Sequence, residues 1–262
     1  MAGATFRAPD GHPTDIERSA IANRSVRRGS ILAGIALLAM TPLAAYANFV
    51  ILGGLITPGD ATATATAILN AEGAFRLGIA SLLTVAVLDL IVAWALYAVF
   101  RPVNRGVALL TAWFRMVFAG IFMVAIAQLT GVLSILNAGD VGAVFTTEQQ
   151  YAQALLGVNA FYEIWDAALI LVGLHLVLLG YLMYQSSAVP SYKSGYIPKV
   201  LGVLLVIAGA GYVIDSFGRV LLANYSFEVA AFTFVGEVLL ILWLLIYGRR
   251  INLDEEPATI AT

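Results

Sequence analysis

The chain alternates long apolar stretches with short polar ones. Six apolar runs stand out, near residues 31–56, 75–100, 106–136, 154–185, 197–223 and 229–248. About twenty apolar residues in an α-helix cross the ~30 Å hydrocarbon core of a bilayer. Lipid offers no partner for backbone N–H and C=O groups, so runs of this length are predicted to be helices. The pattern predicts an all-α, polytopic membrane protein with six transmembrane helices.

Composition supports this fold class. The chain is 61% hydrophobic and only 11% charged, whereas soluble domains carry about 25% charged residues. The tripeptide Ala45-Tyr46-Ala47, after Arg27-Arg28 and an apolar run, imitates a signal-peptide cleavage site. The apolar run continues past it, which favours a retained first membrane helix.

Basic residues predict the orientation, because Lys and Arg concentrate in cytoplasmic loops. In a six-helix arrangement, eleven of the fourteen basic residues fall on one side: Arg7, Arg18, Arg24, Arg27, Arg28, Arg101, Arg105, Lys193, Lys199, Arg249 and Arg250. The opposite loops hold Asp60, Glu72, Asp140, Glu148 and Glu228. Both termini are therefore expected in the cytoplasm.

The pattern divides the chain into three parts. Residues 1–28 are expected to be a disordered cytoplasmic tail, residues 29–250 the transmembrane domain, and residues 251–262 a cytoplasmic C-terminal tail. Within the domain, Asp60 is expected to cap a short helix at the outer surface. The sequence TTEQ at 146–149 fits a capping box, which predicts that the fourth membrane helix starts outside the membrane.

Ionisable residues inside the apolar runs are the candidate functional residues. An Asp, Lys or Arg at a helix centre costs roughly 2.5–3.5 kcal/mol on insertion scales, so these groups are predicted to face inward and satisfy one another. Counting from the helix ends puts four near the midplane and five in the outer half, which favours a polar cavity opening outward. They are Asp89, Arg115, His175 and Glu237, followed by Arg76, Glu163, Asp166, Asp215 and Arg219.

The charges do not balance. Three arginines face five carboxylates, leaving two negative charges if His175 is neutral. The surplus acids are expected to be protonated, exposed to water, or neutralised by a cation. The alternative is structural, because buried ion pairs also fix helix packing. Asp215 and Arg219 are the first example, since their i, i+4 spacing permits a pair within one helix, although Arg219 can also reach Glu163 or Asp166.

Missing residues exclude several chemistries. With no cysteine and no lysine inside an apolar run, thiolate metal sites and a retinal Schiff base are not expected. One intramembrane histidine cannot supply two haem ligands or a multi-histidine zinc site. No nucleotide-binding glycine motif is present. The sequence predicts no metal, no cofactor and no nucleic-acid partner, and it leaves the oligomeric state open.

Several phrases resemble a known family. They are FRLGIASLL (75–83), LYAVFRPVNRGVALLTAWFR (96–115), GLHLVLLGYLMY (173–184) and YIPKVLGVLLVIAGAGYVIDSFGR (196–219). They are similar to the bacterial integral-membrane family catalogued as Domain of Unknown Function 4386, over about residues 25–250. The resemblance implies a six-helix, multi-pass protein of the bacterial inner membrane. It implies no activity, substrate or residue role.

Three hypotheses for the function remain. The first is a small transporter or permease with an outward-facing cavity, in one form proton-coupled, whose ligand is a small molecule or cation. The second is a structural or accessory membrane protein whose charges pair internally or with a partner. The third, which is disfavoured, is an intramembrane enzyme on lipid or isoprenoid substrates, with Glu163 or Asp166 as acid/base and His175 assisting. On this helix His175 is half a turn out of phase with Asp166, which weakens the third hypothesis.

Overall fold

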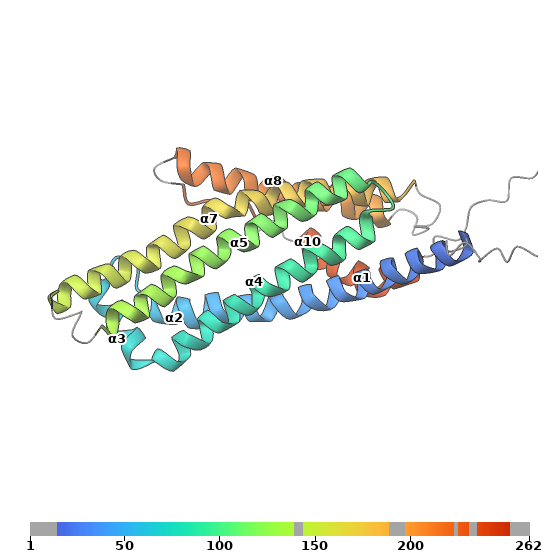
Figure 1. Ribbon diagram of the computed structural model, residues 1–262. Coiled ribbons are helices and arrows are strands. Elements are labelled where there is room, and N and C mark those ends of the chain that lie inside the picture. The colour runs from blue at the N-terminus through green and yellow to red at the C-terminus, as the bar shows by residue number, and fades with distance from the viewer. Residues whose placement is uncertain (1–14, 139–143, 189–196, 223–224, 231–234, 252–262) are drawn as a thin grey trace, which may run out of the picture.

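The computed structural model describes residues 15–138, 144–188, 197–222, 225–230 and 235–251, and all regular structure in these ranges is helical (Figure 1). The long helices are α1 (Asp15–Ala45), α4 (Glu72–Phe100), α5 (Arg105–Leu136), α7 (Thr147–Ser186) and α8 (Ile197–Leu221). The shorter elements are the π-helix η1 (Tyr46–Leu52), α2 (Gly53–Leu55), α3 (Ala61–Asn70), α10 (Val235–Ile246) and the 3-10 helix η3 (Gly248–Arg250).

Five helical stretches are long and apolar enough to cross a membrane. They are Ile21–Leu55, Glu72–Phe100, Arg105–Leu136, Thr147–Ser186 and Pro198–Leu221. Each overlaps one of the first five apolar runs, so the prediction of an all-α chain with several helices long and apolar enough to span a membrane is confirmed. The sixth run contains α10, whose 12 described residues rise about 18 Å. Residues 231–234 lie outside the described residues, and the sixth crossing stays a prediction.

The helices form a ring. α1 packs on α4, α4 on α5, α5 on α7 and α7 on α8, while α10 contacts both α8 and α1 and closes the circle. Each member can therefore direct one face toward a shared interior. On α4 that face is buried and follows i, i+4, i+7 and i+11 spacing, as Val85, Asp89, Val92 and Leu96.

The first helix starts earlier than the sequence predicted. α1 begins at Asp15, so residues 15–28, which were expected to be a disordered tail, are helical. The reason is tertiary packing: Val26 is buried, and Gly29 lies so close to α4 that an added Cβ would stand 2.9 Å from the carbonyl oxygen of Ala95. Residues 1–14 lie outside the described residues.

Two predicted helix caps are confirmed. The Asp60 carboxylate accepts a hydrogen bond from the backbone N–H of Ala63 at 2.8 Å, at the start of α3. Thr146 and Gln149 form the predicted capping box of α7: the Gln149 backbone N–H donates to the Thr146 hydroxyl at 3.3 Å, and the Thr146 backbone N–H donates to the Gln149 side chain at 2.9 Å.

Glycines bring α7 and α8 into close contact. Gly173 on α7 faces Gly209 on α8, where an added Cβ would lie 2.7 Å from the Gly209 carbonyl oxygen. One step along, Gly180 and Gly202 face each other in the same way. Without side chains at these four positions, the two backbones approach as small residues allow in membrane helix pairs. This contact fixes how α8 is placed beside α7.

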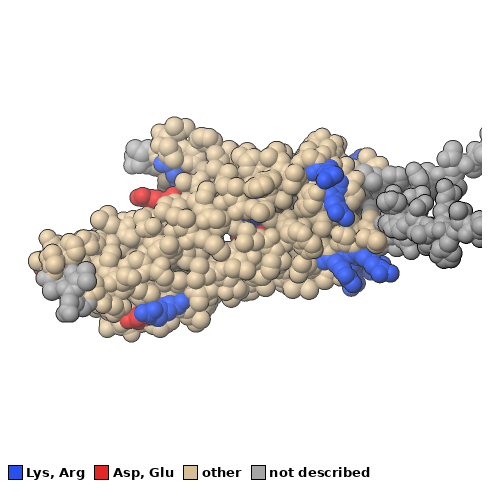
Figure 2. Space-filling view, viewed as in Figure 1, with Lys and Arg blue, Asp and Glu red and all other residues tan. Residues whose placement is uncertain are grey.

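Both ends of the described chain lie at one end of the ring. The Arg27 side chain donates a hydrogen bond of 2.7 Å to the backbone carbonyl of Arg249. Arg101, Arg105 and Lys199 sit at the same end, at the α4–α5 turn and the start of α8, and Figure 2 shows Lys and Arg side chains gathered there. We call this the basic end.

Candidate functional site: a polar cluster inside the helix ring

An ion pair joins α4 to α5 in the interior of the ring. Nη2 of Arg115 lies 2.5 Å from Oδ1 of Asp89, and the two side chains are 13% and 3% exposed. Asp89 reaches this place because it belongs to the buried face of α4. Nε of Arg115 is also buried, and it has no acceptor among the described residues. The guanidinium is thus paired on one side and unsatisfied on another.

His175 of α7 contacts the other side of Arg115. Nδ1 of His175 lies 2.9 Å from the backbone carbonyl oxygen of Thr111, and Nε2 lies 3.3 Å from Nη1 of Arg115. A carbonyl oxygen can only accept and a guanidinium can only donate. Both bonds therefore form only when His175 is neutral, with its proton on Nδ1.

A second acid approaches the same region from α10. The Tyr212 hydroxyl of α8 donates a 3.1 Å hydrogen bond to Oε1 of Glu237, and Glu237 lies within electrostatic range of Arg115 and Asp89. We call Asp89, Arg115, His175, Tyr212 and Glu237 the central cluster. Five helices of the ring, α4, α5, α7, α8 and α10, contribute to it.

The central cluster lies about half a membrane away from the basic end. Arg115 is ten residues from Arg105, and Glu237 is ten residues from Tyr247, which corresponds to about 15 Å along a helix. The hydrocarbon core is ~30 Å thick. If the basic end marks one membrane surface, the cluster sits near the midplane.

The formal charges of the cluster do not cancel. Asp89 and Glu237 are two carboxyl groups, Arg115 is one permanent cation, and the geometry of His175 requires the neutral ring. With both acids ionised the cluster would carry one surplus negative charge at membrane depth. Such a charge is costly in a low-dielectric interior. Asp89 is buried and Glu237 is partly exposed, so a proton, a cation or contact with water at Glu237 would compensate it.

A second group of polar residues lies nearer the other end. Arg219 of α8 forms an ion pair with Asp166 of α7, each side chain about one-third exposed. Arg219 therefore does not pair with Asp215, although the two share a helix face. Instead the buried Asp215 carboxylate accepts hydrogen bonds from the Tyr225 hydroxyl at 2.6 Å and from two backbone N–H groups, those of Val229 and Ala230, at 2.9 and 2.8 Å.

Asp215 thus anchors the segment that follows α8. Gly218, one turn further along the helix, leaves room for the Tyr225 ring, since an added Cβ would lie 2.6 Å from its Cδ2 atom. Tyr225 follows Asp215 by ten residues, and the chain after α8 brings it back to that carboxylate.

Not every predicted site residue faces inward. Arg76 pairs with Glu72 on the surface of α4, and its side chain is 59% exposed. Glu163 is exposed and has no hydrogen bond or ion pair to any described residue. The expectation that all nine groups satisfy one another is wrong for these two. The reason is length: α4 has 29 residues and α7 has 40, more than a crossing requires.

The three residues of the enzyme hypothesis are not brought together. His175 contacts α5, Asp166 pairs with α8, and Glu163 is exposed. Nine residues of one helix separate Asp166 from His175, a rise of about 13 Å. Among the described residues, no group of three or more His, Asp or Glu side chains is placed to hold a metal ion.

Tyr212 is the member of the central cluster that sequence reasoning missed. Its hydroxyl is not ionised at neutral pH, so a search for charges inside apolar runs passes over it. Only the structure, through its hydrogen bond to Glu237, brings Tyr212 into the cluster.

Comparison with known proteins gives the relationships of the chain. The family model described as a domain of unknown function (DUF4386) matches residues 32–248. An uncharacterised protein of Archaeoglobus fulgidus is 36% identical over 174 residues, which cover 66% of this chain and 85% of that protein. No solved structure matches.

Proposed function

This chain belongs to the family defined by the domain of unknown function DUF4386, and we propose that it is a small, proton-coupled transporter or permease. In this proposal it resides in the plasma membrane, the inner membrane of a bacterium, and crosses it six times with both termini in the cytoplasm. The central cluster is the coupling site. A small cation or an amphipathic amine is the substrate class, and the path opens toward the side opposite the basic end.

The surplus acid of the central cluster carries the proposal. Asp89 pairs with the Arg115 guanidinium, and the partly exposed Glu237 lies within electrostatic range of it. The guanidinium also keeps one buried N–H without an acceptor among the described residues. A purely structural network satisfies its members, because a half-satisfied buried network is destabilising. Acids within membrane spans line ion paths and proton relays when they face a bundle interior.

Glu237 is the carboxyl group to which we assign the exchangeable proton. Asp89 is held by Arg115 at 2.5 Å, whereas Glu237 has a neutral phenol as its hydrogen-bond partner. A proton on Glu237 removes the surplus charge without breaking the ion pair. Its release would leave a carboxylate that a cationic substrate can neutralise, so proton and substrate would exchange at one site.

The six-crossing topology rests on the two chain ends. The Arg27–Arg249 hydrogen bond brings the N-terminal half of α1 and η3 together, and a chain whose ends share one side of a membrane crosses it an even number of times. Five candidate spans are identified among the described residues. The sixth crossing in this proposal is the last apolar run, to which α10 belongs.

Proton flux in proteoliposomes tests the function. A pH gradient is imposed, an internal pH-sensitive dye is recorded, and a panel of inorganic cations and amphipathic amines is added. A substrate should collapse the gradient with wild-type protein but not with Glu237→Gln. Glu163→Gln is the matched control, because Glu163 is exposed and unpaired, and it should retain full flux. Flux that survives Glu237→Gln, or no flux with any compound, contradicts the proposal.

The accessory-protein hypothesis keeps one observation in its favour. Asp166, Arg219 and Asp215 are all occupied by partners within the chain, as expected of residues that hold helices and a connecting segment. If the flux assay fails while Asp89→Asn and Glu237→Gln both lower thermal stability, the central cluster is structural too, and the accessory function stands.

A further inference from the structure

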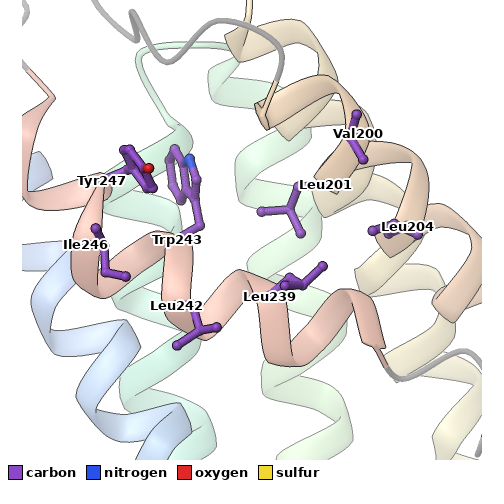
Figure 3. Close-up of a pocket in the computed structure, with 8 residues that line it drawn as sticks. All are labelled: Val200, Leu201, Leu204, Leu239, Leu242, Trp243, Ile246 and Tyr247. Carbon is purple, nitrogen blue, oxygen red and sulfur yellow. The ribbon is translucent and has the colours of Figure 1, made fainter.

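A groove runs between α8 and α10 on the outside of the ring. It encloses about 330 Å³, within the range of roughly 300–1,000 Å³ typical of ligand sites. Its floor is buried, formed by Leu201 and Trp243, and its walls include the exposed side chains of Val200, Leu239 and Leu242 (Figure 3). The lining is almost wholly apolar, which suits a hydrocarbon chain in a membrane.

Positive charge lies where the groove ends. Tyr247 lines the groove, and the exposed Arg249 and Arg250 follow after one residue. Lys199, exposed as well, directly precedes Val200. From the basic end inward, the chain thus offers cations and then the apolar walls of the groove.

We propose that this groove binds one molecule of an anionic phospholipid. Its phosphate would lie beside Arg249 and Arg250, and one acyl chain would lie along Leu239 and Leu242. Basic residues at a membrane surface attract anionic headgroups, and the order of cation and apolar wall matches the order of phosphate and chain. The site is separate from the central cluster.

Native mass spectrometry of the full chain in detergent tests the site, with phosphatidylglycerol and phosphatidylcholine of identical acyl chains as probes. Wild-type protein should retain one phosphatidylglycerol, about thirtyfold more tightly than phosphatidylcholine, if each arginine contributes as surface cations do. Arg249→Gln with Arg250→Gln should abolish this preference.

A groove-filling variant gives the independent test. Leu242→Trp should remove the bound lipid, and Leu90→Trp, at an exposed position of α4, should not. Equal retention of phosphatidylglycerol and phosphatidylcholine by wild-type protein overturns the proposal. So does a Leu242→Trp protein that keeps its lipid but dissociates from a dimer, because a second copy would then occupy the groove. If Leu242→Trp does not fold, the arginine variants decide alone.

Discussion

Arg115 contacts two different kinds of side chain, a carboxylate and a neutral imidazole. The Asp89 carboxylate lies on one side at 2.5 Å and the neutral His175 ring on the other at 3.3 Å. This geometry explains why one arginine can stay charged at membrane depth while a second acid nearby, Glu237, has no cation of its own. In the central cluster, two carboxyl groups therefore accompany only one permanent positive charge.

The partners of Arg219 and Asp215 can be separated by mutation. Asp166→Asn and Arg219→Gln remove the same ion pair, so their losses of stability should overlap, with a coupling energy of about 0.5–1 kcal/mol because both groups are partly exposed. Asp215→Asn should cost about 2–3 kcal/mol by weakening bonds to a buried carboxylate and should add to Arg219→Gln. Thermal unfolding in detergent measures both, and a coupled Asp215–Arg219 pair would refute the assignment.

Tyr225 gives a prediction for alkaline pH. The hydrogen bond that its hydroxyl donates to Asp215 raises the pKa of Tyr225 above its ordinary value of 10. The neutral phenol is the bound form, so its contribution to stability is complete below pH 10 and is lost as pH rises through the folded-state pKa. The melting temperature of wild-type protein should therefore fall more steeply above pH 10 than that of Tyr225→Phe. Tyr184→Phe, at an exposed tyrosine, should behave as wild type.

At the scale of elements, the contact of α7 with α8 fixes how the polar residues of α8 are placed. Arg219 of α8 reaches Asp166 of α7 across this contact, where Gly173 and Gly180 let the two helices approach closely. A change at these glycines should therefore disturb residues more than a turn away.

Matched Gly→Ala substitutions test this contact. At Gly180 an added Cβ would collide with the α8 backbone, so Gly180→Ala should destabilise by about 3 kcal/mol, at the upper end for overpacking. At Gly131 of α5 nothing lies within 4 Å, and Gly131→Ala should stabilise slightly, since alanine favours a helix by about 0.5–1 kcal/mol over glycine. Equal melting temperatures for the two variants would show that α7 and α8 are not in backbone contact.

The elements that the sequence predicted well are those set by local patterns. The apolar runs and the caps at Asp60 and Thr146 depend on neighbours within one helix turn. The partners of Asp215 and Arg219 were ambiguous in the sequence. The spacing of residues along a helix shows which groups could come into contact, but it does not show which of them do. The observed pairing depends on how α8 is rotated relative to α7 and on how the chain after α8 places Tyr225 beside Asp215. Neither can be deduced from the periodic pattern of apolar residues.

At the scale of the whole molecule, the ring and its basic end define the topology. The chain has no cysteine, so single cysteines can be introduced without background. Thr147→Cys and Ser226→Cys should react with a membrane-impermeant maleimide added outside intact cells, and Gly106→Cys and Arg250→Cys should react only after the cells are opened. All four positions are exposed. External labelling of Arg250→Cys with Gly106→Cys protected would mean an odd number of crossings.

The central claim is that the cluster of Asp89, Arg115 and Glu237 holds one exchangeable proton on Glu237. Infrared difference spectroscopy of the protein in lipid, recorded across a pH titration, detects the C=O stretch of a protonated carboxyl group directly. We predict a protonated-carboxyl band in wild-type protein and in Glu163→Gln that is absent from Glu237→Gln. A spectrum without such a band, or a band that persists in Glu237→Gln, would contradict the account.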